Sequence, residues 1–337
     1  MPGLIDVHAH CLPPVYREAA AATGLSVFDG GYPIPAWSTK TALEFMDRHA
    51  IAGQILSLAS PPVHTVAGPA GAAGLALRAN DEIASITAAH PGRFTATAVL
   101  PLPDIDATLK TIAYCFDDLG VCGVTLFTHY DGHYLGDRLY DPVFAELDAR
   151  HALVLLHPTS PAAADRTRLG RPSPVVEFPL DTTRAVTHLL YSGTLRRHPN
   201  LCIVVPHAGA AIPALSWRLA RFASSPFLPA GDEPLTADEA VKQLRALYFD
   251  VALSANDPAL AALTALADPA RILFGTDHPF APEEAVRENS AGLRSSRHLT
   301  GAQRRAIGRR NALALLPAHH PFTAAPPQPD PENGDVP

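Results

Sequence analysis

Eight apolar runs of strand length alternate with helix-like stretches along most of this chain of 337 residues. Such alternation is typical of a parallel sheet whose strands are joined by crossover helices. Eight strand–helix repeats in a chain of this length predict an α/β fold, a single (β/α)8 barrel of the TIM type. The expected strands are Leu4–His10, Gln54–Ala59, Phe94–Leu100, Gly123–Phe127, Leu153–His157, Leu201–Pro206, Leu247–Val251 and Arg271–Gly275. The expected helices are Thr41–His49, Asn80–Ala89, Ala107–Leu119, Pro142–Arg150, Thr182–Arg197, Ile212–Phe222, Pro258–Ala267 and Gly301–Leu316.

Three segments depart from this alternation. Residues 25–38 are rich in Gly and Pro, and we expect an irregular insertion after the first strand that lies over the barrel mouth. Residues 63–74, rich in Gly and Ala, predict a second, flexible loop. Residues 318–337 are rich in Pro and predict a disordered or peripheral tail, so we expect the barrel domain to span residues 1–317.

The composition disfavours several classes of protein. The net charge is −7 and no basic stripe is present, which argues against a nucleic-acid partner. No apolar run approaches the roughly 18 residues that span a bilayer, and the first strand begins without a signal-peptide pattern. The four cysteines are scattered and form no CxxC pair, which predicts reduced thiols and a cytoplasmic location.

Polar side chains gather where the expected strands end. His8 and His10 are two positions apart at the end of the first strand, so both point to the same side. His157 ends the fifth strand, His207 follows the sixth, and Asp277 follows the eighth. In a (β/α)8 barrel the carboxyl ends of the strands carry the functional residues. We therefore expect these five side chains to meet at the barrel mouth.

Three imidazoles and one carboxylate, with one position left open, are a ligand set that suits a catalytic zinc-like ion. We predict His8, His10, His157 and Asp277 as metal ligands. His207 is then expected to act as a general acid or base, or to orient a metal-bound water.

The same residues carry a family resemblance. The motifs Asp6-Val7-His8-Ala9-His10, Leu156-His157-Pro158, Pro206-His207-Ala208-Gly209 and Gly275-Thr276-Asp277-His278-Pro279-Phe280 resemble the signature of the amidohydrolase superfamily. Within it they are similar to the amidohydrolase 2 branch, which includes aminocarboxymuconate-semialdehyde decarboxylase, and the likeness covers nearly the whole barrel. The resemblance implies an enzyme with one divalent ion, Zn²⁺ or Mn²⁺, no organic cofactor and a homodimeric state. Many members of this branch release CO2 from a carboxylate.

The lysines bear on the number of metal ions. Other branches of the superfamily hold two ions bridged by a carboxylated lysine at the end of the fourth strand. The expected fourth strand, Gly123–Phe127, contains no lysine, and none of the three lysines of the chain ends an expected strand. A single ion is therefore expected.

The resemblance also bears on the substrate. The segment from Thr125 to Asp148 resembles bacterial 6-methylsalicylate decarboxylase-like proteins, which implies a hydroxylated aromatic carboxylic acid as substrate. His129 and Tyr130 are expected either to contact the ring or to serve as packing groups. Arg218 matches an arginine that contacts substrate carboxylate in the family, or is one of several arginines on a helix surface. Residues 25–38 lack the arginine found there in the muconate-semialdehyde enzyme, which disfavours an acyclic dicarboxylate.

Alternative reactions remain open at this point. In decarboxylation, an acid protonates the ring carbon and loss of CO2 restores aromaticity. The resemblance implies one of two groups as this acid. It is either Asp277, hydrogen-bonded to His207, or a metal-bound water primed by His207. The same groups suit a mononuclear metal-dependent hydrolase of a lactone or amide. A barrel that binds without catalysis is disfavoured, because it would normally have lost a ligand position and every matching position is intact here.

Overall fold

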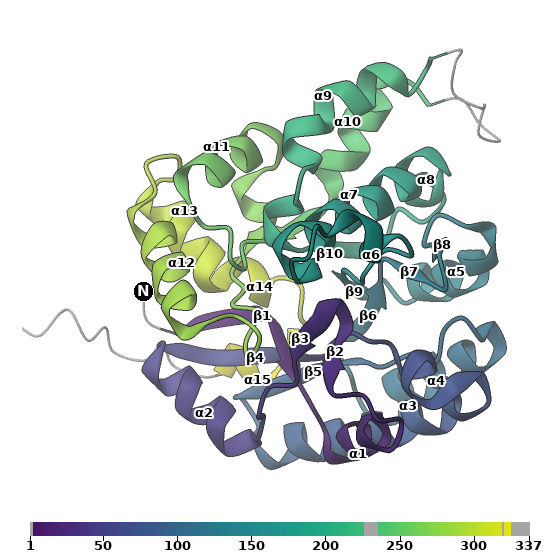
Figure 1. Ribbon diagram of the computed structural model, residues 1–337. Helices are drawn as coiled ribbons and strands as arrows, with labels where there is room; N and C mark the ends of the chain where they lie inside the picture. Colours follow the sequence, from purple (N-terminus) through teal and green to yellow (C-terminus); the bar gives the residue numbers. More distant parts are fainter. Residues whose placement is uncertain (1–2, 226–234, 319, 325–337) are drawn as a thin grey trace, which may run out of the picture.

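The computed structural model describes residues 3–225, 235–318 and 320–324 of the chain. Eight parallel strands form one sheet in which each strand pairs with the next one along the chain, which confirms the predicted barrel (Figure 1). These strands are β1 (Leu4–Cys11), β4 (Ile51–Leu58), β5 (Phe94–Ala98), β6 (Gly123–Phe127), β9 (Leu153–His157), β10 (Cys202–Val205), β11 (Tyr248–Asp250) and β12 (Ile272–Leu273).

Helices surround the strands (Figure 1). The longer ones are α1 (Pro14–Ala22), α2 (Thr39–Arg48), α3 (Val63–Ala89), α4 (Ile105–Asp117), α5 (Asp141–Ala149), α7 (Ser173–Tyr191), α9 (Ile212–Phe222), α10 (Ala237–Ala246), α11 (Asp257–Leu266) and α12 (Glu283–Ser295). Apolar side chains on one face of the sheet pack against this ring of helices, and a smaller apolar cluster fills the inside of the barrel. The strands are therefore buried on both faces, which explains their nearly continuous apolar sequences.

The barrel closes between β1 and the segment that follows β12. The Val7 amide donates to the carbonyl of Phe274 at 3.0 Å, and the Asp277 amide donates to the carbonyl of His8 at 2.8 Å. The His10 amide donates to the carbonyl of His278 at 2.7 Å. These bonds place Asp277 beside both histidines of β1, although some 270 residues separate them in the chain.

The first two of the three segments expected to be irregular contain regular secondary structure. Residues 63–74, expected as a flexible loop, belong to α3, and non-helical geometry occurs at Gly68 (φ 68°, ψ 168°) just before Pro69. The prediction was wrong because alanine favours helix strongly and outweighs the scattered glycines. Residues 25–38 contain a short antiparallel ribbon, β2 (Val27–Phe28) and β3 (Tyr32–Pro33), and side chains of this ribbon lie over the barrel mouth as expected.

Several helix boundaries also differ from the expectation. Helices α1, α10 and α12 were not predicted, and α7 begins at Ser173 rather than Thr182. The expected helix Gly301–Leu316 is divided into α13 (Gly301–Arg305), a π-helical turn (Ala306–Arg310) and α14 (Asn311–Leu313). Among the described residues, no helix is long and apolar enough to cross a bilayer.

Part of the expected tail packs into the barrel. Residues 321–324 form the short helix α15 (Pro321–Ala324), whose Phe322 side chain is completely buried. A Cβ atom added to Gly53 of β4 would lie 2.8 Å from the Phe322 ring, so the glycine makes room for the ring. Arg309 donates to the carbonyl of Phe322 at 3.0 Å. Phe322 is therefore part of the packed barrel rather than peripheral, whereas Pro321 and Thr323 are exposed and residues 325–337 lie outside the described residues.

Replacing Phe322 with alanine is expected to lower the free energy of unfolding by about 3–5 kcal/mol, because it leaves a cavity in the apolar cluster inside the barrel. Urea unfolding followed by circular dichroism measures this change. Leu169→Ala is the matched control, since Leu169 is 87% exposed and its truncation should cost less than about 0.5 kcal/mol. Equal stability of the two variants would contradict the buried position of Phe322.

Candidate metal centre

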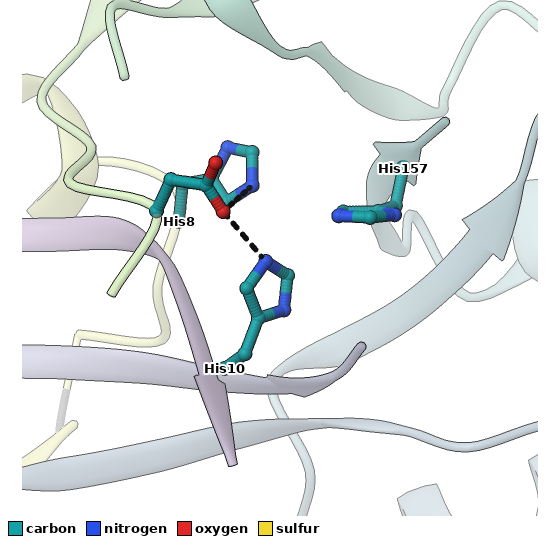
Figure 2. Close-up of side chains that lie close together, drawn as sticks. His8, His10 and His157 are labelled. Atoms are coloured by element: carbon teal, nitrogen blue, oxygen red, sulfur yellow. Dashed lines mark hydrogen bonds and ion pairs between the residues drawn. The ribbon is translucent and has the colours of Figure 1, made fainter. Parts of the chain in front are cut away.

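The four predicted metal ligands meet at the carboxyl end of the barrel. His8 and His10 come from β1, His157 ends β9, and Asp277 follows β12. Each offers one ligand atom, and these atoms all lie within 4.8 Å of one another. Figure 2 shows the rings of His8, His10 and His157 around a common space. The structure thus brings together residues that the sequence placed at the ends of three different strands.

In each of the three histidines, the ring nitrogen turned away from this space has a partner. The Nδ1 atom of His8 lies 2.9 Å from an oxygen of Asp250, and Nδ1 of His10 lies 2.9 Å from the hydroxyl of Ser57. The Nδ1 atom of His157 lies 2.7 Å from the carbonyl oxygen of Pro158. Partners of this kind fix the tautomer and the ring orientation of metal-binding histidines. They leave each Nε2 atom available as a ligand.

The remaining contacts fit a divalent cation. The Nε2 atom of His8 is buried and has no hydrogen-bond partner among the described residues. An oxygen of Asp277 lies 3.2 Å from Nε2 of His10 and 3.6 Å from Nε2 of His8. A buried nitrogen without a partner is costly in a folded protein, and a cation between these atoms would satisfy it. Imidazole nitrogens and one carboxylate are also the ligands that Zn²⁺ accepts.

The electrostatics of the site favour the metal-binding forms of several ligands. Burial and the nearby charges of His10 and His8 hold the pKa of His157 well below its usual value, and burial lowers the pKa of His10. Burial opposes ionisation of Asp277, but hydrogen bonds with His10 and His207 hold its pKa well below the usual range. Neutral imidazoles and an ionised carboxylate are the forms that bind metal. For His8, burial lowers the pKa, but the carboxylate of Asp250 outweighs it and raises the pKa to about 9.

His207 lies beside this cluster. It follows β10 in a tight turn in which both His207 and Ala208 have a φ of 55°. Its backbone amide donates to an oxygen of Asp250 at 3.1 Å, which fixes the start of the turn. Its Nε2 atom lies 3.7 Å from the second oxygen of Asp277, and its Nδ1 atom has no hydrogen-bond partner among the described residues. The imidazole is therefore close enough to exchange a proton with Asp277 after a small movement.

Two buried carboxylates support the site and had no predicted role. Asp250 contacts the ring of His8 and the amide of His207, so it joins two parts of the centre. Asp6 accepts hydrogen bonds from the hydroxyl of Thr276 at 2.6 Å and from the amide of Gln54 at 2.9 Å, and it thereby holds the turn that carries Asp277. Burial raises the pKa of Asp6 to about 6. The available signal for Asp250 was an acidic residue near the end of the expected strand Leu247–Val251.

Replacing Asp250 with asparagine is expected to weaken metal affinity by roughly 10- to 100-fold, because His8 loses its charged partner while the shape of the side chain is kept. Competition with a chromophoric chelator measures the affinity. Asp268→Asn is the control, since Asp268 caps a short helix at the opposite end of β12. Unchanged affinity in the Asp250 variant would contradict its orienting role.

A cavity of about 350 Å³ opens above the centre. His157, His207 and Asp277 form its polar floor, and most of its wall is apolar. The wall includes Phe28, Ala59, Pro174, Val175, Phe178, Pro179, Leu253, Phe280 and Pro282, with Asp29, Tyr32, Ser60 and Ser254 as its polar members. A cavity of this size and lining suits a small aromatic molecule with one polar end.

The three residues predicted to contact substrate do not line this cavity. His129 in β7 (His129–Tyr130) lies 3.1 Å from the carbonyl oxygen of Ser160 and borders a neighbouring hollow. Tyr130 is fully buried, and its hydroxyl accepts a hydrogen bond from the amide of Phe127 at 3.1 Å. Arg218 is exposed on α9, and its guanidinium lies over the ring of Phe222. Within the single chain, the structure thus places Tyr130 as a packing group and Arg218 on a helix surface.

A (β/α)8 barrel with a histidine–aspartate centre at the carboxyl ends of its strands defines a class of metal-dependent enzymes. Residues 5–318 match the family model described as amidohydrolase, and the chain belongs to this family, which confirms the predicted resemblance.

Curated relatives and solved structures agree with this assignment. The chain is 37% identical over 287 residues to the 6-methylsalicylic acid decarboxylase of Aspergillus aculeatus. The aligned region covers 84% of this chain and 86% of the relative. It is 31% identical over 288 residues to the gamma-resorcylate decarboxylase of a Rhizobium species, covering 82% and 86%. A crystal structure of 2,6-dihydroxybenzoate decarboxylase complexed with 2,6-dihydroxybenzoate superimposes with a TM-score of 0.76 at 26% identity, covering 94% of this chain and 99% of the other.

Proposed function

We propose that this protein is a metal-dependent, non-oxidative decarboxylase that releases CO2 from a hydroxylated aromatic carboxylic acid of the salicylate type, such as 6-methylsalicylate. The observation that carries the proposal is the position of the four-ligand centre on the floor of an apolar cavity of aromatic size. The names of the similar proteins, which specify decarboxylases of hydroxylated aromatic acids, support the same reaction.

His8, His10, His157 and Asp277 are the residues that would hold one divalent ion, Zn²⁺ or Mn²⁺. We propose that no organic cofactor takes part. When bound, the ion would supply positive charge that stabilises negative charge on the oxygens of the substrate. The partners of the three histidines, Asp250 among them, keep these ligands in place before the substrate arrives.

The other side chains of the cavity bind the ring and move a proton. Phe28, Phe178 and Phe280 offer apolar surface to the aromatic ring and exclude water from it. The pair His207 and Asp277 can hold a proton and deliver it to the ring carbon that bears the carboxylate. The bond from this carbon to the carboxylate then breaks, its electrons return to the ring, and CO2 leaves.

The test is product analysis with a panel of aromatic acids. Metal-stripped protein is reloaded with Zn²⁺ or with Mn²⁺ and incubated with salicylate, 6-methylsalicylate and 2,6-dihydroxybenzoate, and CO2 and the corresponding phenol are measured. We expect metal-dependent release of both products in equal amounts. No release from any acid by fully metal-loaded protein, together with hydrolysis of a lactone or amide panel, would overturn the proposal in favour of a hydrolase.

We further propose that the protein acts as a homodimer in the cytoplasm. All four cysteines are free, which supports a reducing compartment. Five large apolar side chains on α7 and α9 are exposed, and such surface is typical of a contact with a second copy; they are Val175, Val176, Leu180, Trp217 and Phe222. Light scattering after gel filtration tests the dimer, and fractionation of cells that express the chain tests the location.

A further inference from the structure

Asp29 is the acidic residue that the insertion after β1 brings to the barrel mouth. It lies in the turn between β2 and β3, directly before Gly30, whose φ of 77° allows the chain to reverse. One of its carboxylate oxygens, Oδ2, accepts hydrogen bonds from the hydroxyl of Ser60 at 2.6 Å, from the amide of Ser160 at 2.8 Å and from the hydroxyl of Thr159. These donors follow β4 and β9, so the carboxylate is fixed to two separate strand ends.

The other oxygen of this carboxylate is free to meet a ligand. No residue that the structure describes donates a hydrogen bond to Oδ1 of Asp29, and the side chain borders the cavity above the metal centre. No lysine or arginine is among the described residues that line this cavity. Arg168 approaches the neighbouring Gly31 but is paired with Asp165 at 3.0 Å. Asp29 is therefore a fixed negative charge in the cavity wall without a cationic partner.

This charge gives the cavity two different polar ends. With a divalent ion held by its ligands, the floor would attract the carboxylate of a substrate, whereas the wall at Asp29 would repel any further anion. Two like charges a few ångströms apart in a poorly solvated cavity repel each other strongly. A neutral hydroxyl, in contrast, can donate a hydrogen bond to Oδ1 of Asp29, and a methyl group can lie on the apolar wall beside it.

We propose that Asp29 is a specificity-determining residue that makes this enzyme accept aromatic monocarboxylates with neutral ring substituents and reject aromatic dicarboxylates. This inference rests on the proposed function, because it takes one substrate carboxylate to be bound at the metal centre. It goes further by assigning the selection between ring substituents to a single side chain of the insertion.

The test compares salicylate with two salicylates that carry a second carboxylate, 2-hydroxyisophthalate and 4-hydroxyisophthalate, which present that group on different sides of the ring. Dissociation constants are measured by calorimetry on metal-loaded protein, and kcat/KM is measured where turnover occurs. Wild-type protein should bind each dicarboxylate at least about tenfold more weakly than salicylate. In Asp29→Asn, this ratio should fall about tenfold for at least one of the two isomers.

Two further variants separate charge from other effects. Asp29→Glu keeps the charge and should keep the rejection of dicarboxylates. Asp117→Asn removes one negative charge from an exposed side chain outside the cavity and should also keep it. The proposal is overturned if Asp29→Asn rejects both dicarboxylates as strongly as wild type does, or if wild type binds all three acids alike. If the binding ratios behave as expected but no acid releases CO2, the proposed function fails while the role of Asp29 stands.

Discussion

Replacement of Asp277 by asparagine is expected to lower kcat by about 10³-fold or more, since the pair that exchanges a proton with the substrate is lost. Asparagine has nearly the same shape, so the turn after β12 and the bonds that close the barrel should persist. The amide, however, cannot carry the exchanged proton, and it offers no negative charge to His10 at 3.2 Å or to His207 at 3.7 Å. The measurement is single-turnover CO2 release at metal concentrations that saturate the variant.

The variant His207→Ala separates the two roles proposed for Asp277, metal binding and proton transfer, because His207 is outside the set of metal ligands. This variant should lose about 10²- to 10⁴-fold in kcat and yet bind metal with nearly wild-type affinity. Asp277→Asn should lose activity and affinity together. If the fully metal-loaded Asp277 variant keeps more than a tenth of the activity, Asp277 takes no part in proton transfer. His207 is then the proton donor to test.

The sequence was informative about the barrel and the ligand set for the same physical reason. A parallel strand buried on both faces has a continuous apolar sequence, and the polar residue that ends it stands out. His8, His10, His157 and Asp277 could therefore be placed at one mouth from eight strand positions alone, without knowledge of any contact.

The rest depends on contacts between distant parts of the chain. Asp250 becomes meaningful only when closure of the barrel brings β11 within one strand of β1 and its carboxylate reaches His8, 242 residues away. Asp29 lies in a segment whose path is decided by hydrogen bonds with Ser60 and Thr159, which sequence pattern does not reveal. Phe322 follows a proline-containing stretch, and its burial depends on the space above Gly53.

The substrate contacts were the least predictable part for a similar reason. His129 and Tyr130 do follow a barrel strand, as the rule for functional residues requires. The short hairpin of β7 and β8 (His133–Tyr134), however, turns them into the protein, where backbone groups take up their polar atoms. Position at a strand end therefore indicates which residues can reach the mouth, and the loop that follows the strand decides which of them do.

Removal of the metal is expected to abolish decarboxylation and to lower the melting temperature. Metal ions bound to the folded state stabilise it by mass action, so metal at a hundred times its dissociation constant should raise the melting temperature by roughly 4 °C. Calorimetry of stripped and reloaded protein measures this shift without any substrate, and His157→Ala, which lacks one ligand, is the matched control that should respond much less. Full activity in stripped protein would contradict a metal-dependent reaction. A normal shift in melting temperature without recovered activity would show that the four ligands bind metal as proposed and that the chemistry assigned to them is wrong.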